Sequence, residues 1–78
     1  MQDLLITLAQ GLVENPDAVN VTVDEADEEG VIVYHLHVAE GDMGKVIGRQ
    51  GRIAKEIRTI IKTVALRTGE RVSVEIMD

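Results

Sequence analysis

Apolar residues recur at intervals of three and four near the start of the chain, and this spacing predicts an amphipathic helix over residues 3–14. The positions that share one face are Leu5, Leu8, Ala9, Leu12 and Val13. Asp3 is suited to cap the first turn, because a carboxylate accepts hydrogen bonds from the free N–H groups there. The sequence Asn15-Pro16-Asp17 is expected to end the helix, since proline cannot continue it.

Two strands are predicted next, and they are expected to pair as an antiparallel hairpin. In the first strand, Val19, Val21 and Val23 alternate with polar residues. The second strand spans residues 31–39 and is rich in β-branched side chains. The acidic stretch over residues 25–30 between them is the expected turn.

The second half of the chain predicts two helices and a third strand. A short helix over residues 43–47, capped by Asp42, precedes a longer helix over residues 52–68, which Gly69 is suited to end in a left-handed conformation. The apolar side of the longer helix consists of Ile53, Ile57, Ile60, Ile61 and Val64. Alternating apolar and polar residues over 71–77 predict the last strand. The order α-β-β-α-α-β indicates an α+β fold with a three-stranded sheet packed against helices in two layers.

A chain of 78 residues with Tyr34 as its only aromatic side chain predicts a single domain over residues 1–78 with a small aliphatic core. Such a domain is expected to be marginally stable alone, which favours a homodimer or a larger complex. The sequence contains no cysteine, which excludes disulfides, thiolate metal sites and a cysteine nucleophile. Because the sequence has neither an apolar run of membrane length nor a basic leader, we expect a cytoplasmic protein without a membrane partner.

Charge divides the sequence into an acidic and a basic part. Residues 1–44 contain ten Asp or Glu and no Lys or Arg, whereas all eight basic residues lie between Lys45 and Arg71. The net charge of −6 therefore conceals a basic cluster that suits nucleic acid, while the acidic part would repel nucleic acid from other faces. A mixed-charge, solvated helix face is the alternative explanation of the cluster.

The basic cluster surrounds two glycines within residues 44–53, Gly-Lys-Val-Ile-Gly-Arg-Gln-Gly-Arg-Ile. Gly48 and Gly51 would join the two helices, where unpaired N–H groups and the helix dipole favour an anion. Glycine has no side chain to keep a phosphate away from these groups. The residues that add positive charge or a neutral donor are Lys45, Arg49, Gln50, Arg52 and Lys55.

Apolar residues on both sides of the glycines could form a groove as wide as a nucleic acid base. These residues are Val46, Ile47 and Ile53. A single strand could then place its phosphates on the loop and its bases over the groove. The alternative is that Gly48 and Gly51 only make a tight turn between packed helices.

Catalysis and metal binding have weaker support in the sequence. His35 and His37 share one face of the second strand, but the spacing fixes no third ligand. Ser73 has no evident base or acid beside it in the pattern. We therefore expect no enzyme activity, metal or cofactor.

The sequence Val46-Ile47-Gly48-Arg49-Gln50-Gly51 resembles the V-I-G-x-x-G core of KH domains, whose loop clamps about four nucleotides of a single strand. The element order is similar to type II KH domains. Residues 41–55, the Asn15-Pro16-Asp17 turn and the terminal Val-Glu-Ile-Met-Asp resemble the small bacterial KH proteins of the KhpA family. This resemblance implies a lone-domain RNA binder that forms homodimers, pairs with the larger protein KhpB and acts as an RNA chaperone or post-transcriptional regulator.

The resemblance also implies roles for individual residues. Residues 48–51 correspond to the clamp, and Ile47 would line the groove together with Ile53 or Ala54. The family often has isoleucine three positions after the second glycine, where this chain has Ala54. The expected RNA-binding set is Lys45, Ile47, Gly48, Arg49, Gln50, Gly51, Arg52, Ile53 and Lys55. The alternative function is a protein-interaction or dimerisation module with little affinity for RNA.

Overall fold

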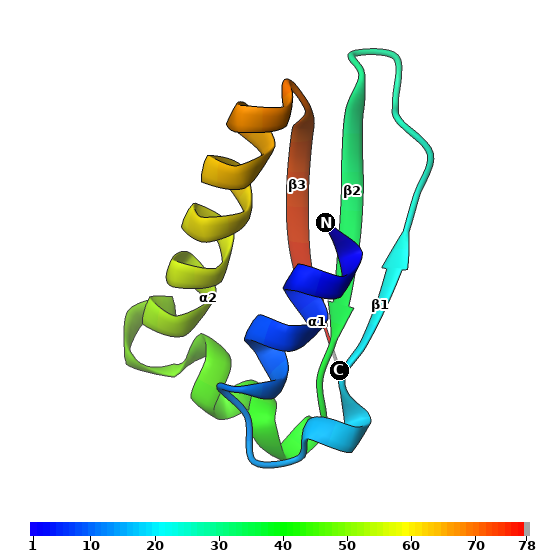
Figure 1. Ribbon diagram of the computed structural model, residues 1–78. Coiled ribbons are helices and arrows are strands. Elements are labelled where there is room, and N and C mark those ends of the chain that lie inside the picture. The colour runs from blue at the N-terminus through cyan, green and yellow to red at the C-terminus, as the bar shows by residue number, and fades with distance from the viewer. Residues whose placement is uncertain (78) are drawn as a thin grey trace.

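The structure is a computed structural model that describes residues 1–77, with the side chains of Arg49 and Gln50 outside the description. Helices and strands follow one another in the order shown in Figure 1. Their bounds are α1 Gln2–Gln10, the 3-10 helix η1 Pro16–Ala18, β1 Asn20–Val23, β2 Val31–His37, α2 Glu40–Thr68 and β3 Arg71–Met77. The expected α-β-β-α-α-β order is confirmed, with the last two expected helices joined as two arms of α2.

The two arms of α2 meet at Gly51, whose φ of 69° lies in the left-handed region. Only glycine adopts this conformation without a steric penalty. The segment remains helical in its hydrogen bonding, but the helix changes direction at this point (Figure 1). We refer to residues 40–50 as the first arm, to residues 52–68 as the second arm, and to residues 48–51 as the bend. The second arm ends as expected at Gly69, whose φ is 76°.

The strands form a sheet in the order β1-β2-β3. β1 and β2 are antiparallel, with Val21 opposite Leu36, which confirms the predicted hairpin. β2 and β3 are parallel, with Tyr34 opposite Val74. Parallel neighbours need a long crossover connection, and α2 supplies it.

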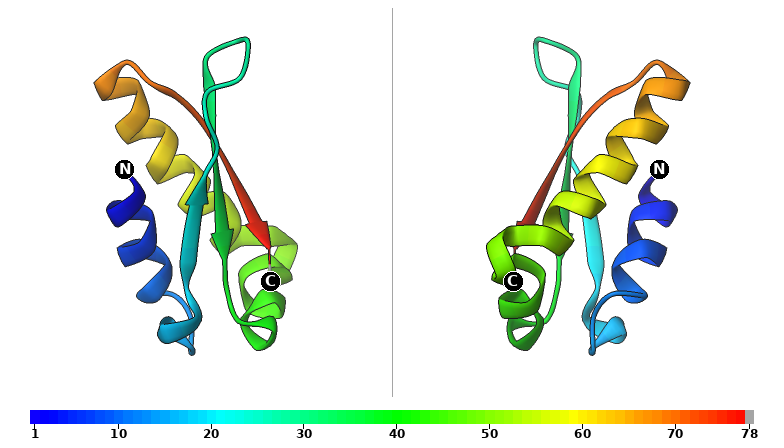
Figure 2. Two further views of the ribbon diagram at one scale, coloured as in Figure 1. Left: turned by 90° about the vertical axis from the view of Figure 1, so that its right-hand side faces the viewer. Right: turned by 90° about the vertical axis from the view of Figure 1, so that its left-hand side faces the viewer.

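The core lies between the sheet and the two helices. The second arm of α2 crosses the strands obliquely (Figure 2), and it packs mainly on β3, whereas α1 packs on β1 and β2. The buried cluster comprises Leu5, Ala9, Val21, Tyr34, Leu36, Val38, Ile57, Ile61, Ala65, Val72 and Val74. Burial of one large aliphatic side chain contributes about 1.5–3 kcal/mol, so the fold rests on a small number of such residues.

The first helix differs from its predicted bounds at both ends. It ends at Gln10 rather than residue 14, and Gly11 follows as its cap. The prediction failed at this end because the N–H groups of Glu14 and Asn15 donate to the Asp42 carboxylate instead of to helix carbonyls. At the start, Met1 occupies the cap position, so Asp3 lies within the first turn and is not the cap.

The start of α2 corrects a second prediction. The helix begins at Glu40 with Ala39 as its cap residue, so the expected short helix over 43–47 begins three residues earlier. Asp42 is therefore not a cap: it is a buried side chain whose partners belong to the segment after α1. The apolar side of the second arm also differs, because Ile60 is 41% exposed and Ala65 takes a core position.

Candidate nucleic-acid interface

A hollow of about 330 Å³ lies beside the bend of α2. Gly44, Lys45, Gly48 and Ile53 line it. Gly44, Lys45 and Gly48 lie within one turn of the first arm, while Ile53 lines the hollow from the second arm. The fold thus places three residues of the expected set, Lys45, Gly48 and Ile53, around one depression.

The apolar residues near the bend divide into exposed and buried positions. Ile47 is 50% exposed, as expected of a side chain that could contact a base. Val46 and Ala54 are buried, so the expectation that Val46 flanks the groove is wrong. Ile53, rather than Ala54, supplies the apolar wall of the hollow. Side chains at neighbouring helical positions face different directions, which explains why Val46 and Ile47 differ.

The basic residues of the expected set have different surroundings. Lys45 Nζ donates to Glu14 Oε1. Arg52 Nε lies 3.7 Å from Glu56 Oε1, an exposed pair one helical turn apart that adds little stability. Lys55 is exposed on the second arm. Arg49 and Gln50 belong to the bend, but their side chains fall outside the described residues.

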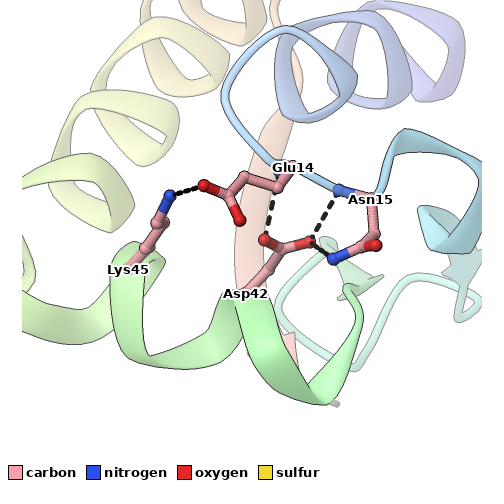
Figure 3. Close-up of polar contacts among 4 residues, drawn as sticks. All are labelled: Glu14, Asn15, Asp42 and Lys45. Carbon is pink, nitrogen blue, oxygen red and sulfur yellow. Dashed lines mark hydrogen bonds and ion pairs between the residues drawn. The ribbon is translucent and has the colours of Figure 1, made fainter.

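Asp42 fixes the first arm to the rest of the molecule (Figure 3). Its Oδ1 accepts a hydrogen bond of 3.1 Å from the Glu14 N–H. Its Oδ2 accepts bonds of 3.1 Å and 3.2 Å from the backbone N–H and the side-chain Nδ2 of Asn15. Burial acts to raise the pKa of the Asp42 carboxyl, but these hydrogen bonds and the Lys45 charge together lower the pKa below its ordinary value.

The sequence pattern did not predict this anchor, because Glu14 and Asn15 are 28 and 27 residues away from Asp42 in the chain. The only local signal was an aspartate near a helix start, which favours a cap. The Asn15-Pro16-Asp17 sequence indicated a turn but gave no reason to connect that turn with Asp42.

The acidic turn between β1 and β2 lies at the opposite end of the molecule from the bend (Figure 1). Its carboxylates are therefore remote from the hollow, in a molecule with principal extents of 34 × 20 × 19 Å. Asp27 is engaged in the turn itself, since its Oδ1 accepts hydrogen bonds from the N–H groups of Glu29 and Val31. The carboxylates of this turn are thus separated from the bend, whereas Glu14 and Asp42, from the same acidic part of the sequence, lie at the first arm.

His35 belongs to a polar cluster on the sheet. Its Nε2 lies 2.8 Å from Asp24 Oδ2, and its Nδ1 lies 3.5 Å from Glu75 Oε2. The hydrogen bond to Asp24 and the two carboxylate charges raise the pKa of His35, while partial burial opposes them. Within residues 1–77, no group of three or more His, Asp or Glu side chains is arranged to hold a metal ion. No helix in that range is both long and apolar enough to cross a membrane.

Two known proteins match this chain over almost its whole length and over their own. The RNA-binding protein KhpA of Clostridium acetobutylicum is 53% identical over 77 residues, which cover 99% of this chain and 100% of the relative. The RNA-binding protein KhpA of Listeria monocytogenes is 38% identical over 78 residues, which cover 100% of this chain and 100% of the relative.

A solved structure and a family model complete the comparison. The structure of Era in complex with MgGDPNP and nucleotides 1506–1542 of 16S ribosomal RNA matches 97% of this chain with a TM-score of 0.66. Identity there is 20%, and the match covers 28% of the Era chain, so this likeness concerns the fold. The family model described as KhpA/KhpB, KH domain matches residues 2–76. The chain therefore belongs to the KhpA/KhpB family of KH domains, a family of RNA-binding proteins rather than enzymes.

Proposed function

We propose that this protein binds single-stranded RNA at the bend of α2 and catalyses no reaction. The phosphates of the strand lie over the bend, and one or two bases contact Ile47 and Ile53 beside it. The relatives named RNA-binding protein KhpA support this function, because they match the whole length of the chain. The proposed contact set is Lys45, Ile47, Gly48, Arg49, Gln50, Gly51, Arg52, Ile53 and Lys55.

Gly48 is the observation that carries the proposal. Gly51 needs glycine because of its positive φ, but Gly48 has an ordinary helical backbone. A Cβ atom built at Gly48 would meet nothing within 4 Å. Alanine at a helical position is more stable than glycine by about 0.5–1 kcal/mol, so the fold itself gives no reason for this glycine. Close approach of a phosphodiester backbone does give one.

Replacement of Gly48 by alanine separates these explanations. We expect Gly48→Ala to raise the free energy of unfolding by about 0.5–1 kcal/mol and to weaken RNA binding, because the new methyl group blocks the phosphate. Gly41→Ala is the matched control, since Gly41 is also helical, also has nothing within 4 Å of a Cβ and does not line the hollow. Fluorescence anisotropy with a short labelled single-stranded RNA measures both variants. Equal affinity of Gly48→Ala and Gly41→Ala would refute a clamp at Gly48.

Single strands are proposed as the ligand because the hollow is small and apolar on one side. Unstacked bases can enter such a site, whereas bases inside a duplex are paired and stacked. Tyr34, the only aromatic residue, is buried in the core, so no aromatic side chain is available for stacking and affinity per nucleotide is low. Duplex RNA that competes as well as the single strand would contradict this choice of ligand.

A second feature supports assembly in addition to RNA binding. Ile60 and Leu66 on the second arm are 41% and 79% exposed, so the fold itself leaves much of both apolar side chains uncovered. We propose that this arm contacts a second copy of the chain or a KhpB-like protein in the cytoplasm, where the assembly acts as an RNA chaperone or regulator.

Sedimentation equilibrium of the wild type and Leu66→Lys tests the contact. A wild type that remains monomeric at tens of micromolar, roughly the range of weak dimers, would exclude the homodimer.

A further inference from the structure

Lys45 is a proposed phosphate contact, yet its ammonium group already has a carboxylate partner. Lys45 Nζ donates to Glu14 Oε1 (Figure 3), and the same lysine lines the hollow together with Gly48. Glu14 belongs to the segment between α1 and η1, far from the bend in sequence. A phosphate that enters the hollow must therefore share this lysine with Glu14 or displace Glu14 from it.

The backbone of Glu14 is held in place independently of the ion pair. Its N–H donates to Asp42 Oδ1 at 3.1 Å, and the next residue, Asn15, makes two bonds to Oδ2. These three hydrogen bonds join the segment to the first arm without help from Lys45. Glu14 can release Lys45 only by rotation of its side chain, and the carboxylate then remains close to the hollow.

The exposure of the ion pair makes exchange with a phosphate feasible. The side chains of Lys45 and Glu14 are 53% and 69% exposed, so water reaches both charged groups. Exposed ion pairs contribute little free energy, because water screens the attraction and ordering of the side chains opposes it. A phosphate oxygen can replace the Glu14 carboxylate on the lysine at a similarly small cost.

We propose that Glu14 is an internal competitor of RNA, which occupies Lys45 in the free protein and limits the affinity of the bend for phosphate. This inference rests on the proposed RNA-binding function. The structural alternative is that the ion pair only fastens the segment to α2. The hydrogen bonds of Asp42 argue against that alternative, since they already fasten it.

Glu14→Gln is the direct test, because glutamine keeps the size and the backbone N–H while it removes the charge. We expect this variant to bind a short labelled single-stranded RNA about two- to five-fold more tightly than the wild type at low salt. Its affinity should also fall more steeply with salt, by up to about 0.7 in the slope of log K against log salt, because Lys45 then exchanges counterions for phosphate.

Glu28→Gln is the matched control. It removes the same charge from the acidic turn at the opposite end of the molecule (Figure 1). We expect its affinity for RNA to equal that of the wild type. An equal gain in Glu14→Gln and Glu28→Gln would show that overall charge alone matters and would overturn the inference.

A double-mutant cycle with Lys45→Gln isolates the competition. If Glu14 acts by occupying Lys45, Glu14→Gln gains much less affinity when Lys45 is already glutamine. The same gain in both backgrounds, or no gain in the wild-type background, would overturn the inference. A wild type that binds no RNA at any salt concentration would refute the proposed function together with it. RNA binding that Gly48→Ala weakens and Glu14→Gln leaves unchanged would refute the competitor alone.

Discussion

The two arms of α2 are held to the rest of the molecule by different forces. The second arm contributes Ile57, Ile61 and Ala65 to the main core cluster. The first arm packs the half-buried Met43 against that cluster and buries Val46 outside it, and its fully buried polar side chain, Asp42, binds the segment after α1. Apolar contacts tolerate small shifts, whereas three hydrogen bonds to one carboxylate fix direction and distance. The second arm therefore supplies most of the stability, and the first arm supplies the position of the bend.

The largest expected effect comes from the core of the second arm. Ile57→Ala should lower the free energy of unfolding by about 2–5 kcal/mol, because Ile57 is 1% exposed and its removal leaves a cavity. Ile60→Ala on the same arm is the matched control and should lower it by about 1 kcal/mol or less, since Ile60 is already 41% exposed in the folded protein. Urea unfolding monitored by circular dichroism measures both. Similar losses in the two variants would mean that the second arm does not pack as described.

Removal of the Asp42 hydrogen bonds should lower the global stability less than Ile57→Ala does. It should act selectively on the first arm and the bend. Asp42→Asn keeps the shape of the side chain but replaces one of the two accepting oxygens by an NH2 donor, which then faces an N–H group instead of accepting a hydrogen bond from it. Amide hydrogen exchange in residues 40–48 should become faster by about tenfold, with a weaker change at Ile57 and Ile61. RNA affinity should fall as the bend loses its position. Asp17→Asn, an exposed carboxylate in η1, is the control for charge.

Uniform acceleration of exchange along both arms in Asp42→Asn would erase the distinction between them. So would an Asp42→Asn variant in which the first arm exchanges as slowly as in the wild type. The first result would make the anchor part of one cooperative core, and the second would leave the first arm held by its apolar contacts.

Acid should weaken the hydrogen bonds of Asp42, as Asp42→Asn does, but to a smaller extent. The pKa of Asp42 is lower in the folded protein than its ordinary value, so its contribution to stability is complete above the unfolded pKa and disappears as pH falls through the folded one. The first arm should therefore begin to open below about pH 4, ahead of the second arm, whose core side chains do not titrate. Hydrogen exchange measured at several pH values detects the order. In Asp42→Asn, this difference between the arms should no longer depend on pH.

Local patterns in the sequence predicted most of the fold, while contacts between distant segments escaped them. The apolar spacing predicted the helices and the hairpin, and Gly69 ended the second arm because one residue determines a left-handed cap. The parallel pairing of β3 with β2 depends on the path of α2 and leaves no local trace. The Asp42 anchor likewise joins segments that are 27 and 28 residues apart.

The candidate site shows the same division between local and distant information. The glycine spacing predicted the junction between the two arms, whereas the anion site that the basic residues around it indicate stays a prediction. Which apolar residue faces outward depends on how the arms pack, so the sequence pattern alone puts Val46 wrongly in the groove and does not decide between Ile53 and Ala54. The pairing of Lys45 with Glu14 follows from the Asp42 anchor and was equally hidden.

The central claim is that RNA occupies the bend between the two arms, and NMR titration tests it most directly. A 15N-labelled protein is titrated with a short single-stranded RNA, and the shifts of backbone amides are followed residue by residue. The account predicts the largest changes at Gly44, Lys45, Gly48, Gly51 and Ile53, with little change in the acidic turn between β1 and β2. Changes centred on that turn or on the sheet around His35, or no change at saturating RNA, would contradict it.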